Sequence, residues 1–546
     1  MPDQSQSVRD MVFGGPRAAM RDAAPASTSV GTEADDFCSI LFPNDCAEVA
    51  DEGQAPDHFR DLNLDQITRA ITDGRESYTL LPFFYAPAPD VATIEYRQAV
   101  MRDVERPPIR VALEAYAAGM QTLNSIFERA RRAYYEHERS RLLLAAAQTY
   151  VRSVTELEHA LSVSQDATSC GMRRLRAHLR HVVASERFGA FAADTRRTAA
   201  DLAAIRYGLL LKDDRVGVRS YPREAEQSPE AVATFAALSG APDADAIAPG
   251  AVSDVAVNHI QAQILDRLAL LYPGPFAALA AFRERHADFV DASIRRFTRE
   301  IQFYLAYAEY IERFRRAGLS FCYPRVSAAK EIRCRAAFDA ALAGTLIAEH
   351  RPIVCNDIDL HGSERIVVVS GPNQGGKTTF ARMFGQLHFL ASLGCPVPGT
   401  EAHVHFCDGI VTHFERVEHA TSLRGKLKDD LIRIRGMLNA SSPRTIIILN
   451  EIFSSTTARD ALFLSTRVLQ RIAAVDALAV CVTFLTELAS LNEKTVSVVA
   501  AMDACGTDER TFRLERKAPD GRAFALAIAR KYGLTYAGLR QRISRP

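Results

Sequence analysis

The feature that most constrains the fold of this chain is a strand-like run that enters a helix-like run through a short glycine-bearing turn, "RIVVVSGPNQGGKTTFAR" (365–382). The β-branched apolar run from Ile366 to Ser370 predicts a buried strand, and the residues from Thr379 to Leu393 predict a helix. A buried strand joined to a helix in this way is typical of a parallel sheet covered by helices. We therefore expect an α/β domain in this part of the chain.

Three regions of different composition are expected. Residues 1–55 are rich in Ala, Ser, Asp, Gly and Pro, which predicts a mobile tail with one short docked segment around "FCSILFP". Residues 56–345 carry long helical patterns, with a β-like insertion near 207–221. Residues 346–546 alternate strand-like and helix-like runs, which predicts a mostly parallel sheet. The expected architecture is a long-helix, mainly α region followed by an α/β domain.

Bulk composition narrows the class of protein. The 66 basic residues balance the 66 acidic ones, so the whole chain lacks the basic excess typical of a dedicated nucleic-acid binder, although a local basic face stays possible. The ten cysteines form no C-x-x-C pair, and we expect all of them to be reduced thiols. The most apolar stretch, 268–282, contains Pro273 and Pro275 and falls short of the roughly 20 residues that a membrane span needs. These observations predict a soluble, cytoplasmic protein.

The turn after the first strand matches a nucleotide-binding pattern. Residues 371–378 fit Gly-x-x-x-x-Gly-Lys-[Ser/Thr] without a mismatch. In that pattern the backbone curls round a triphosphate, the lysine reaches the β- and γ-phosphates, and the hydroxyl ligates Mg²⁺. We expect Lys377 and Thr378 to take these roles, with ATP and Mg²⁺ bound together. The expected ATP-binding residues are Gly371, Pro372, Asn373, Gln374, Gly375, Gly376, Lys377, Thr378 and Thr379.

A second apolar run, "RTIIILNE" (444–451), ends in polar residues that suit a catalytic role. Glu451 is the expected base or water-orienting group, and Asn450 is expected to contact Mg²⁺ through a water molecule. An amide at position 450 brings no charge to the metal. Two interpretations stay open: a tolerated substitute with slower turnover, or a site built to bind ATP tightly and to hydrolyse it slowly.

Several ordered segments resemble the ATPase domain of the MutS DNA mismatch-repair family. A guanine-reading Asn-Lys-x-Asp motif is absent from the sequence, which disfavours a GTPase. The similar segments cover about 350 to 540 and read "GPNQGGKTTFAR" (371–382), "LGCPVPGTEA" (393–402), "DGIVTHFE" (408–415), "TSLRGKLKDDLIRI" (421–434), "NEIFSSTTARDA" (450–461), "VTFLTELASL" (482–491) and "RTFRLERKAPDGRAFALAIARKYGL" (510–534). The helical region before them resembles the family's core and lever more weakly.

The resemblance implies an ABC-like P-loop ATPase domain that closes with a second copy on ATP. Ser422 matches the family's signature serine, which reaches the γ-phosphate bound to the other protomer, and is therefore a third expected catalytic residue beside Glu451 and Asn450. Thr456 matches the threonine after the second motif. The implied function is an ATP-gated homodimer that acts on DNA, in mismatch repair or in binding recombination-related structures. Residues 1–55 are too short for the family's mismatch-reading domain.

The sequence also departs from the family pattern at the residues that handle ATP. Asn450 replaces an aspartate, and Phe484 and Thr486 fall near the family's switch histidine. Residues 453–455, "FSS", replace Gly-Arg-Gly. A phenyl ring cannot form a hydrogen bond to a phosphate. We therefore expect hydrolysis to be slow.

Contact with DNA depends on local features. Arg173, Arg176 and Arg180 share one face of an expected helix, which either meets phosphates or is an ordinary solvated face. The zero net charge and the altered ATP-handling residues leave a second class of function open, an ATP-dependent interaction scaffold that does not work on DNA. A small-molecule kinase is a third class, but the sequence offers no motif for its substrate pocket.

Overall fold

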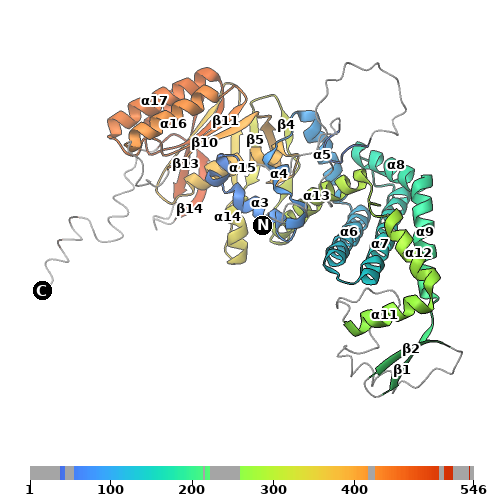
Figure 1. Ribbon diagram of the computed structural model, residues 1–546. Helices are drawn as coiled ribbons and strands as arrows, with labels where there is room; N and C mark the ends of the chain where they lie inside the picture. Colours follow the sequence, from blue (N-terminus) through green and yellow to red (C-terminus); the bar gives the residue numbers. More distant parts are fainter. Residues whose placement is uncertain are drawn as a thin grey trace. The chain divides into compact units, whose positions relative to one another are not determined.

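A computed structural model describes residues 37–43, 54–212, 215–221, 259–415, 425–502 and 510–519, together with 536 and 540. The chain divides into two compact units (Figure 1). Unit 1 contains Met1–Phe37 and Glu105–Thr298, and unit 2 contains Cys38–Val104 and Arg299–Pro546. The units differ from the ranges expected from composition, because the described residues between 38 and 104 group with the C-terminal part of the chain.

Unit 1 consists mainly of long helices, as the Gly- and Pro-poor stretches predict. They are α6 (Pro107–Arg132), α7 (Glu136–Val163), α8 (Cys170–Ala184), α9 (Glu186–Ala203), α11 (His259–Leu271), α12 (Pro273–Arg285) and the first residues of α13 (Ala292–Arg316). Two strands, β1 (Tyr207–Lys212) and β2 (Arg215–Ser220), pair as an antiparallel hairpin at the two extended runs of the sequence. Phe191 stacks on Phe289 in the core, with 5.1 Å between ring centroids.

The most apolar stretch of the chain lies in α11 and α12. Pro273 is the first residue of α12, where its missing N–H costs no hydrogen bond, so the proline separates two helices instead of breaking one. Among the described residues, no single helix is long and apolar enough to cross a membrane. Only α11 and α12 taken together pass that test of length and composition, and the pair is bent by 109°.

Unit 2 is built on a six-stranded sheet, and the expectation of an α/β fold is confirmed. The strand order is β10-β11-β12-β7-β13-β14. These strands are β7 (Ile366–Ser370), β10 (Gly409–His413), β11 (Thr445–Asn450), β12 (Leu478–Val482), β13 (Thr495–Met502) and β14 (Arg510–Arg516). Every pair is parallel except β13 with β14, which is antiparallel.

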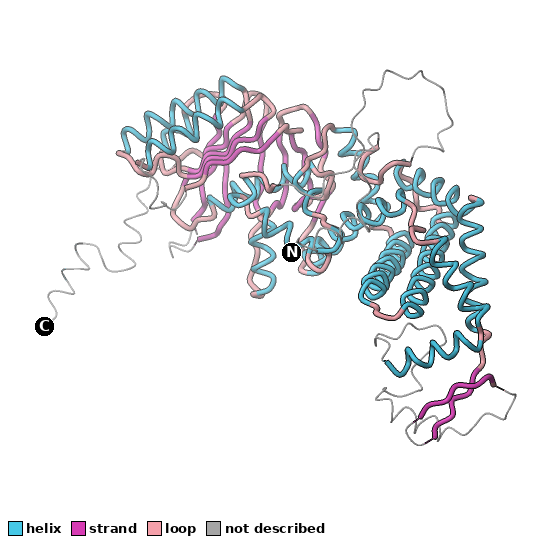
Figure 2. The backbone as a smooth tube through the Cα atoms, viewed as in Figure 1, coloured by secondary structure: helices cyan, strands magenta, loops and turns pink. Residues whose placement is uncertain are grey.

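Helices cover both faces of this sheet (Figure 2). Ile447 and Leu449 of β11 pack in one hydrophobic cluster with α17 (Ala458–Val475) and with Ile434 of α16 (Lys426–Ala440). Ile448 points to the opposite face, where a Cβ atom on Gly385 of α15 (Lys377–Ser392) would lie 2.7 Å from its Cδ1. The central strands are therefore buried on both sides, which explains why their sequences are continuously apolar.

Smaller elements complete unit 2. A four-stranded sheet has the order β4 (Arg325–Ser327), β9 (Glu401–His405), β5 (Ile332–Ala337) and β6 (Asn356–Leu360), and β3 (Phe321–Cys322) pairs with β8 (Val397–Pro398). The helices are α2 (His58–Asp61), α3 (Leu64–Thr72), η1 (Glu76–Tyr78), α4 (Leu81–Tyr85), α5 (Val91–Val104), α14 (Ala340–Ala348), η3 (Thr486–Ser490) and the rest of α13.

The expected docked segment around "FCSILFP" is confirmed. The Ser39 hydroxyl and the Ile40 N–H both donate to a carboxylate oxygen of Glu300, at 2.8 and 2.9 Å. The buried guanidinium of Arg97 donates to the carbonyls of Leu41 and Leu393. Hydrogen bonds to charged groups in a buried setting are strong, so they hold this segment in unit 2.

One prediction about the cysteines is wrong. Cys38 is disulfide-bonded, so not every cysteine of the chain is a reduced thiol. Sequence spacing did not reveal this bond because pairing depends on the distance and direction between Cβ atoms in the folded chain. The free cysteines among the described residues are Cys170, Cys322, Cys334, Cys355, Cys395, Cys407 and Cys481.

Candidate nucleotide site

The turn between β7 and α15 has a backbone that only glycine adopts easily. Gly371 has a φ of 124° and Gly376 a φ of 90°. At Gly371 a Cβ atom would also lie 2.9 Å from the Cβ atom of Ala500, so a side chain does not fit there. Asn373 and Gln374 are exposed at the tip of the turn. The sequence pattern therefore corresponds to a tight turn that joins β7 to the start of α15.

Lys377 is the first residue of α15 and is folded back onto this turn. Its ammonium donates to the carbonyls of Gly371, at 2.9 Å, and of Pro372, at 3.0 Å. The Phe484 ring centroid lies 4.4 Å from the Nζ atom. Burial lowers the pKa of Lys377, and the negative charge of Glu451 opposes this effect.

Thr378 connects the start of α15 to the end of β11, which lies two strands away from β7 in the sheet. Its hydroxyl donates to the Asn450 side-chain oxygen at 3.0 Å. A hydroxyl and an amide oxygen are hard oxygen donors, which suit Mg²⁺, an ion that keeps several waters and takes further oxygens from a bound phosphate. The residues present therefore fit a magnesium ion held jointly with a nucleotide. The described residues contain no cluster of three or more His, Cys, Asp or Glu side chains suited to an all-protein metal site.

Glu451 follows Asn450 in a left-handed backbone conformation, with a φ of 54°. Its N–H donates to the Val482 carbonyl at 2.9 Å, which fixes it at the carboxyl end of the sheet. Burial raises the pKa of Glu451, the charge of Lys377 lowers it, and the charge of Glu415 raises it. The carboxyl group is thus near the lysine and in partial contact with solvent.

Phe453 explains one departure from the resembled family. It has a φ of 60°, a conformation in which glycine is unstrained and a bulky residue is rare. Its side chain is only 1% exposed and packs in the cluster between the sheet and α17. The burial of the ring offsets the backbone strain, so this position acts as a hydrophobic anchor for the turn after Glu451.

A polar network that the sequence did not reveal lies beside Glu451. Glu415, which follows β10, forms an ion pair with Lys426 at the start of α16. Ser454 donates to the same Glu415 oxygen at 3.2 Å. The two ends of segment 416–424 are therefore linked to the turn after β11. Ser422, expected as a catalytic residue, lies in that segment and outside the described residues.

The remaining predicted residues lie near the site or in unit 1. Thr379 is partly buried in the first turn of α15, Thr456 lies partly buried before α17, and Thr486 begins η3. On α8, Arg173 donates to the Thr168 carbonyl and Arg180 to the Ser162 hydroxyl. Two of the three arginines thus have hydrogen-bond partners within unit 1. This favours an ordinary solvated helix face over a face that contacts DNA phosphates.

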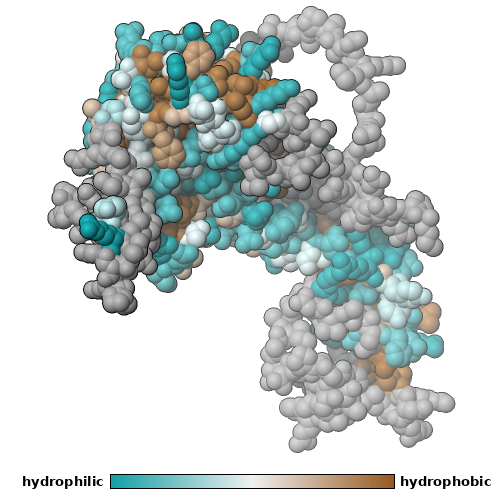
Figure 3. Space-filling view, turned by 90° about the vertical axis from the view of Figure 1, so that its left-hand side faces the viewer, coloured by the Kyte–Doolittle hydropathy of each residue, from teal (hydrophilic) through white to brown (hydrophobic). Residues whose placement is uncertain are grey.

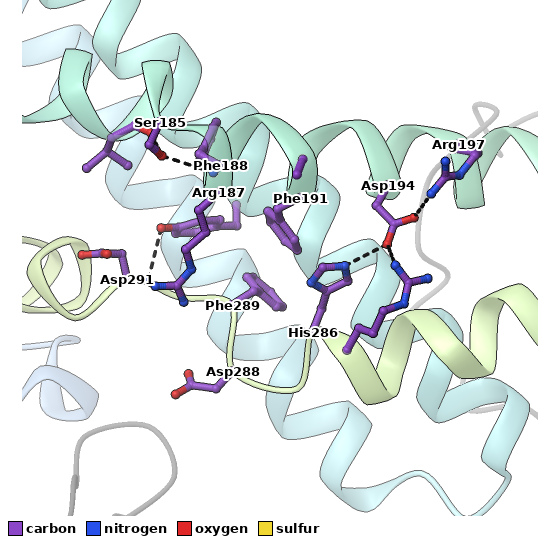
Figure 4. Close-up of a pocket in the computed structure, with 14 residues that line it drawn as sticks. Ser185, Arg187, Phe188, Phe191, Asp194, Arg197, His286, Asp288, Phe289 and Asp291 are labelled. Carbon is purple, nitrogen blue, oxygen red and sulfur yellow. Dashed lines mark hydrogen bonds and ion pairs between the residues drawn. The ribbon is translucent and has the colours of Figure 1, made fainter.

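Unit 1 contains a cavity of about 490 Å³ between α9 and the segment after α12 (Figure 4). Phe188, Phe191 and Phe289 form its apolar wall. The buried Asp194 carboxylate accepts from Arg197 at 2.5 Å and, through its other oxygen, from Arg285 at 2.5 Å and His286 at 2.8 Å. Through its bonds to Arg285 and His286 the single carboxylate links α9 to the end of α12, so the cluster has a structural role.

Replacing Asp194 with alanine is expected to destabilise unit 1 at pH 7, because three donors lose their acceptor. The expected loss is only about 2 kcal/mol, because both arginines are more than half exposed and solvent weakens their ion pairs. Burial raises the pKa of Asp194, but hydrogen bonds from His286 and Arg197 and the charge of Arg285 lower it on balance. Its contribution is therefore present above the unfolded pKa of about 4 and is lost as pH falls through the lower folded value.

Urea unfolding at pH 7 and below pH 3 measures this effect. Asp201→Ala, at an exposed position on the same helix, is the matched control and is expected to change little. An equal loss for both variants, or a loss for Asp194→Ala that persists at the lowest pH, contradicts the assignment.

The fold and the site together are those of an α/β domain. Its glycine turn, Lys377 and the adjacent Asn450 and Glu451 lie at the carboxyl ends of parallel strands. Residues 367–541 match the family model of MutS domain V. The DNA mismatch repair protein MutS of Chloroflexus aurantiacus is 28% identical over 198 residues, 36% of this chain and 20% of that protein. The DNA mismatch repair protein MutS of Chlorobaculum tepidum is 28% identical over 142 residues, 26% of this chain and 16% of that protein.

The resemblance to the MutS family seen in the sequence is therefore confirmed over residues 367–541, which match the model of that family's domain V. The chain matches about a fifth or less of the length of these relatives.

Proposed function

We propose that this chain is a MutS-like P-loop ATPase in which ATP binding gates a homodimer that acts on DNA. The observation that carries the proposal is the turn from Gly371 to Gly376, with Lys377 folded onto it and Thr378 bonded to Asn450. Backbone N–H groups of this turn and the N-terminal end of α15 suit an anion. The matched family model supports the same role.

In this proposal the turn and Lys377 hold the phosphates of ATP, while Thr378 and Asn450 hold Mg²⁺, Asn450 through a water molecule. When bound at these two residues, Mg²⁺ would supply positive charge beside the phosphate oxygens. Glu451 orients the attacking water and accepts its proton. Only the carboxylate form can accept a proton, so the burial that raises the pKa of Glu451 moves the acidic limb of activity upward in pH, and Lys377 opposes that effect.

The dimer is supported by the family match and by the surface of α16 and α17. Leu431, Ile432 and Phe463 are apolar side chains that are 39%, 47% and 59% exposed. Figure 3 shows hydrophobic residues among hydrophilic ones on the face that it presents. Ser422 would complete the site of the second protomer.

ATP hydrolysis with and without mismatched or branched DNA tests the proposal. Binding of ATP and a rate that changes with DNA are expected. Absence of ATP binding, or hydrolysis that no DNA affects, contradicts it.

A second candidate function is an ATP-dependent interaction scaffold that does not work on DNA. The neutral amide at position 450, the phenyl ring at position 484 and the partners of Arg173 and Arg180 favour it. A titration of DNA binding against salt separates the two functions. An affinity that falls steeply with salt indicates phosphate contacts, whereas absent binding or a flat response favours the scaffold.

Replacing Asn450 with aspartate is expected to raise ATP turnover about tenfold, because it adds a negative charge at the proposed metal while keeping the acceptor for Thr378. Steady-state phosphate release measures the effect. Asn450→Ala removes the acceptor and is expected to lower turnover. An unchanged rate in Asn450→Asp means that the amide suffices and that slow hydrolysis has another cause.

A further inference from the structure

The Lys377 ammonium is enclosed on three sides. Two of its three N–H donors are used by the carbonyls of Gly371 and Pro372. The Phe484 ring lies over the same nitrogen, with its centroid 4.4 Å away. Lys377 is only 4% exposed, and among the described residues Glu451 is the one carboxylate whose charge acts on it. The ring face therefore supplies part of the electrostatic stabilisation that a buried cation needs.

The backbone holds Phe484 in this place. It lies two residues after the end of β12, which pairs with β7 in parallel, so its strand ends at the same edge as the glycine turn. The Thr483 N–H donates to the Val369 carbonyl at 3.0 Å, and the Leu485 N–H donates to the Thr483 hydroxyl at 3.0 Å. Phe484 is nevertheless 52% exposed. The backbone around Phe484 is fixed, but the half-exposed ring can rotate away from the lysine without disturbing the core.

We propose that Phe484 is a positioning residue that holds Lys377 on the turn, so that bound phosphates must compete with the ring for the ammonium. This inference rests on the proposed ATP site. A cation–π contact to a half-exposed ring is weaker than a charge-assisted hydrogen bond to phosphate, so ATP displaces the ring at a cost in affinity. The ring thus lowers ATP affinity through Lys377.

The test compares Phe484→Leu, which keeps apolar volume but removes the ring, with Phe484→Tyr, which keeps the ring. ATP affinity is measured by calorimetry with a non-hydrolysable analogue. Phe484→Leu is expected to bind about fivefold more tightly than the unchanged chain, and Phe484→Tyr to bind equally. Because the ring is half exposed, both variants are expected to fold, and thermal unfolding checks this.

A second measurement needs no nucleotide. In protein labelled with ¹³C at lysine Cε, a ring over Lys377 shifts its signal upfield, and Lys377→Arg identifies that signal. The shift is expected in the unchanged chain and in Phe484→Tyr, and is expected to vanish in Phe484→Leu and on addition of the analogue.

The outcomes separate the inference from the function on which it rests. If the analogue binds and Phe484→Leu has unchanged or weaker affinity, or if the ring shift is absent, the inference is overturned while the ATP site stands. If neither the unchanged chain nor Phe484→Leu binds the analogue, the proposed function is wrong and the inference falls with it, whatever the ring shift shows.

Discussion

Replacing Lys377 with alanine is expected to abolish measurable ATP binding, with an affinity loss of at least about 100-fold. Lys377 is the cation folded onto the glycine turn, and within that turn no other side chain carries a positive charge. Without it, the phosphates would lie in a partly buried site with only backbone dipoles to offset their charge. Titration with a fluorescent ATP analogue measures the loss.

Lys428→Ala provides the control, because Lys428 is an exposed cation on α16. It removes the same formal charge from unit 2 and is expected to leave ATP binding unchanged. If Lys377→Ala still binds ATP, or if the two variants lose affinity equally, the nucleotide does not bind at this turn.

Replacing Glu451 with glutamine is expected to lower ATP turnover at least about 100-fold while ATP stays bound, because the amide cannot accept the proton of the attacking water. Glutamine has the same shape, so the left-handed backbone and the bond to Val482 are expected to persist. Trapped ATP then stabilises the proposed dimer, which light scattering detects as a mass increase in the presence of ATP.

Glu487→Gln is a suitable control, since Glu487 is an exposed acid in the neighbouring η3. It is expected to hydrolyse ATP at the rate of the unchanged chain. A normal rate in Glu451→Gln identifies another group as the base, and a dimer that forms equally without ATP argues against gating by the nucleotide.

The parts of the fold that the sequence predicted are local in origin. The strand before Gly371, the helix that follows the turn and the buried strand that ends at Glu451 each follow from a run of adjacent residues. Their meeting at one edge also follows, because parallel strands present their carboxyl ends together. For this reason the sequence alone was enough to expect Lys377, Thr378 and Asn450 in one site.

The features that the sequence did not predict depend on contacts between distant segments. Phe484 reaches Lys377 because β12 pairs with β7, and Glu415 reaches Ser454 because β10 pairs with β11. Residues 38–104 join unit 2 through side chains such as Arg97, which a composition boundary cannot detect. Neither the hydrophobic period of a segment nor its residue types shows which distant side chains it will contact.

The conformation of Phe453 makes the turn after Glu451 and the hydrophobic core mechanically inseparable. A glycine at this position would relax the backbone but would remove a fully packed ring from beneath α17. A change of Phe453 to glycine would therefore require the inner side of that helix to be repacked together with the turn. In this chain, the turn that follows Glu451 is thus anchored by an apolar side chain from the core cluster beneath α17.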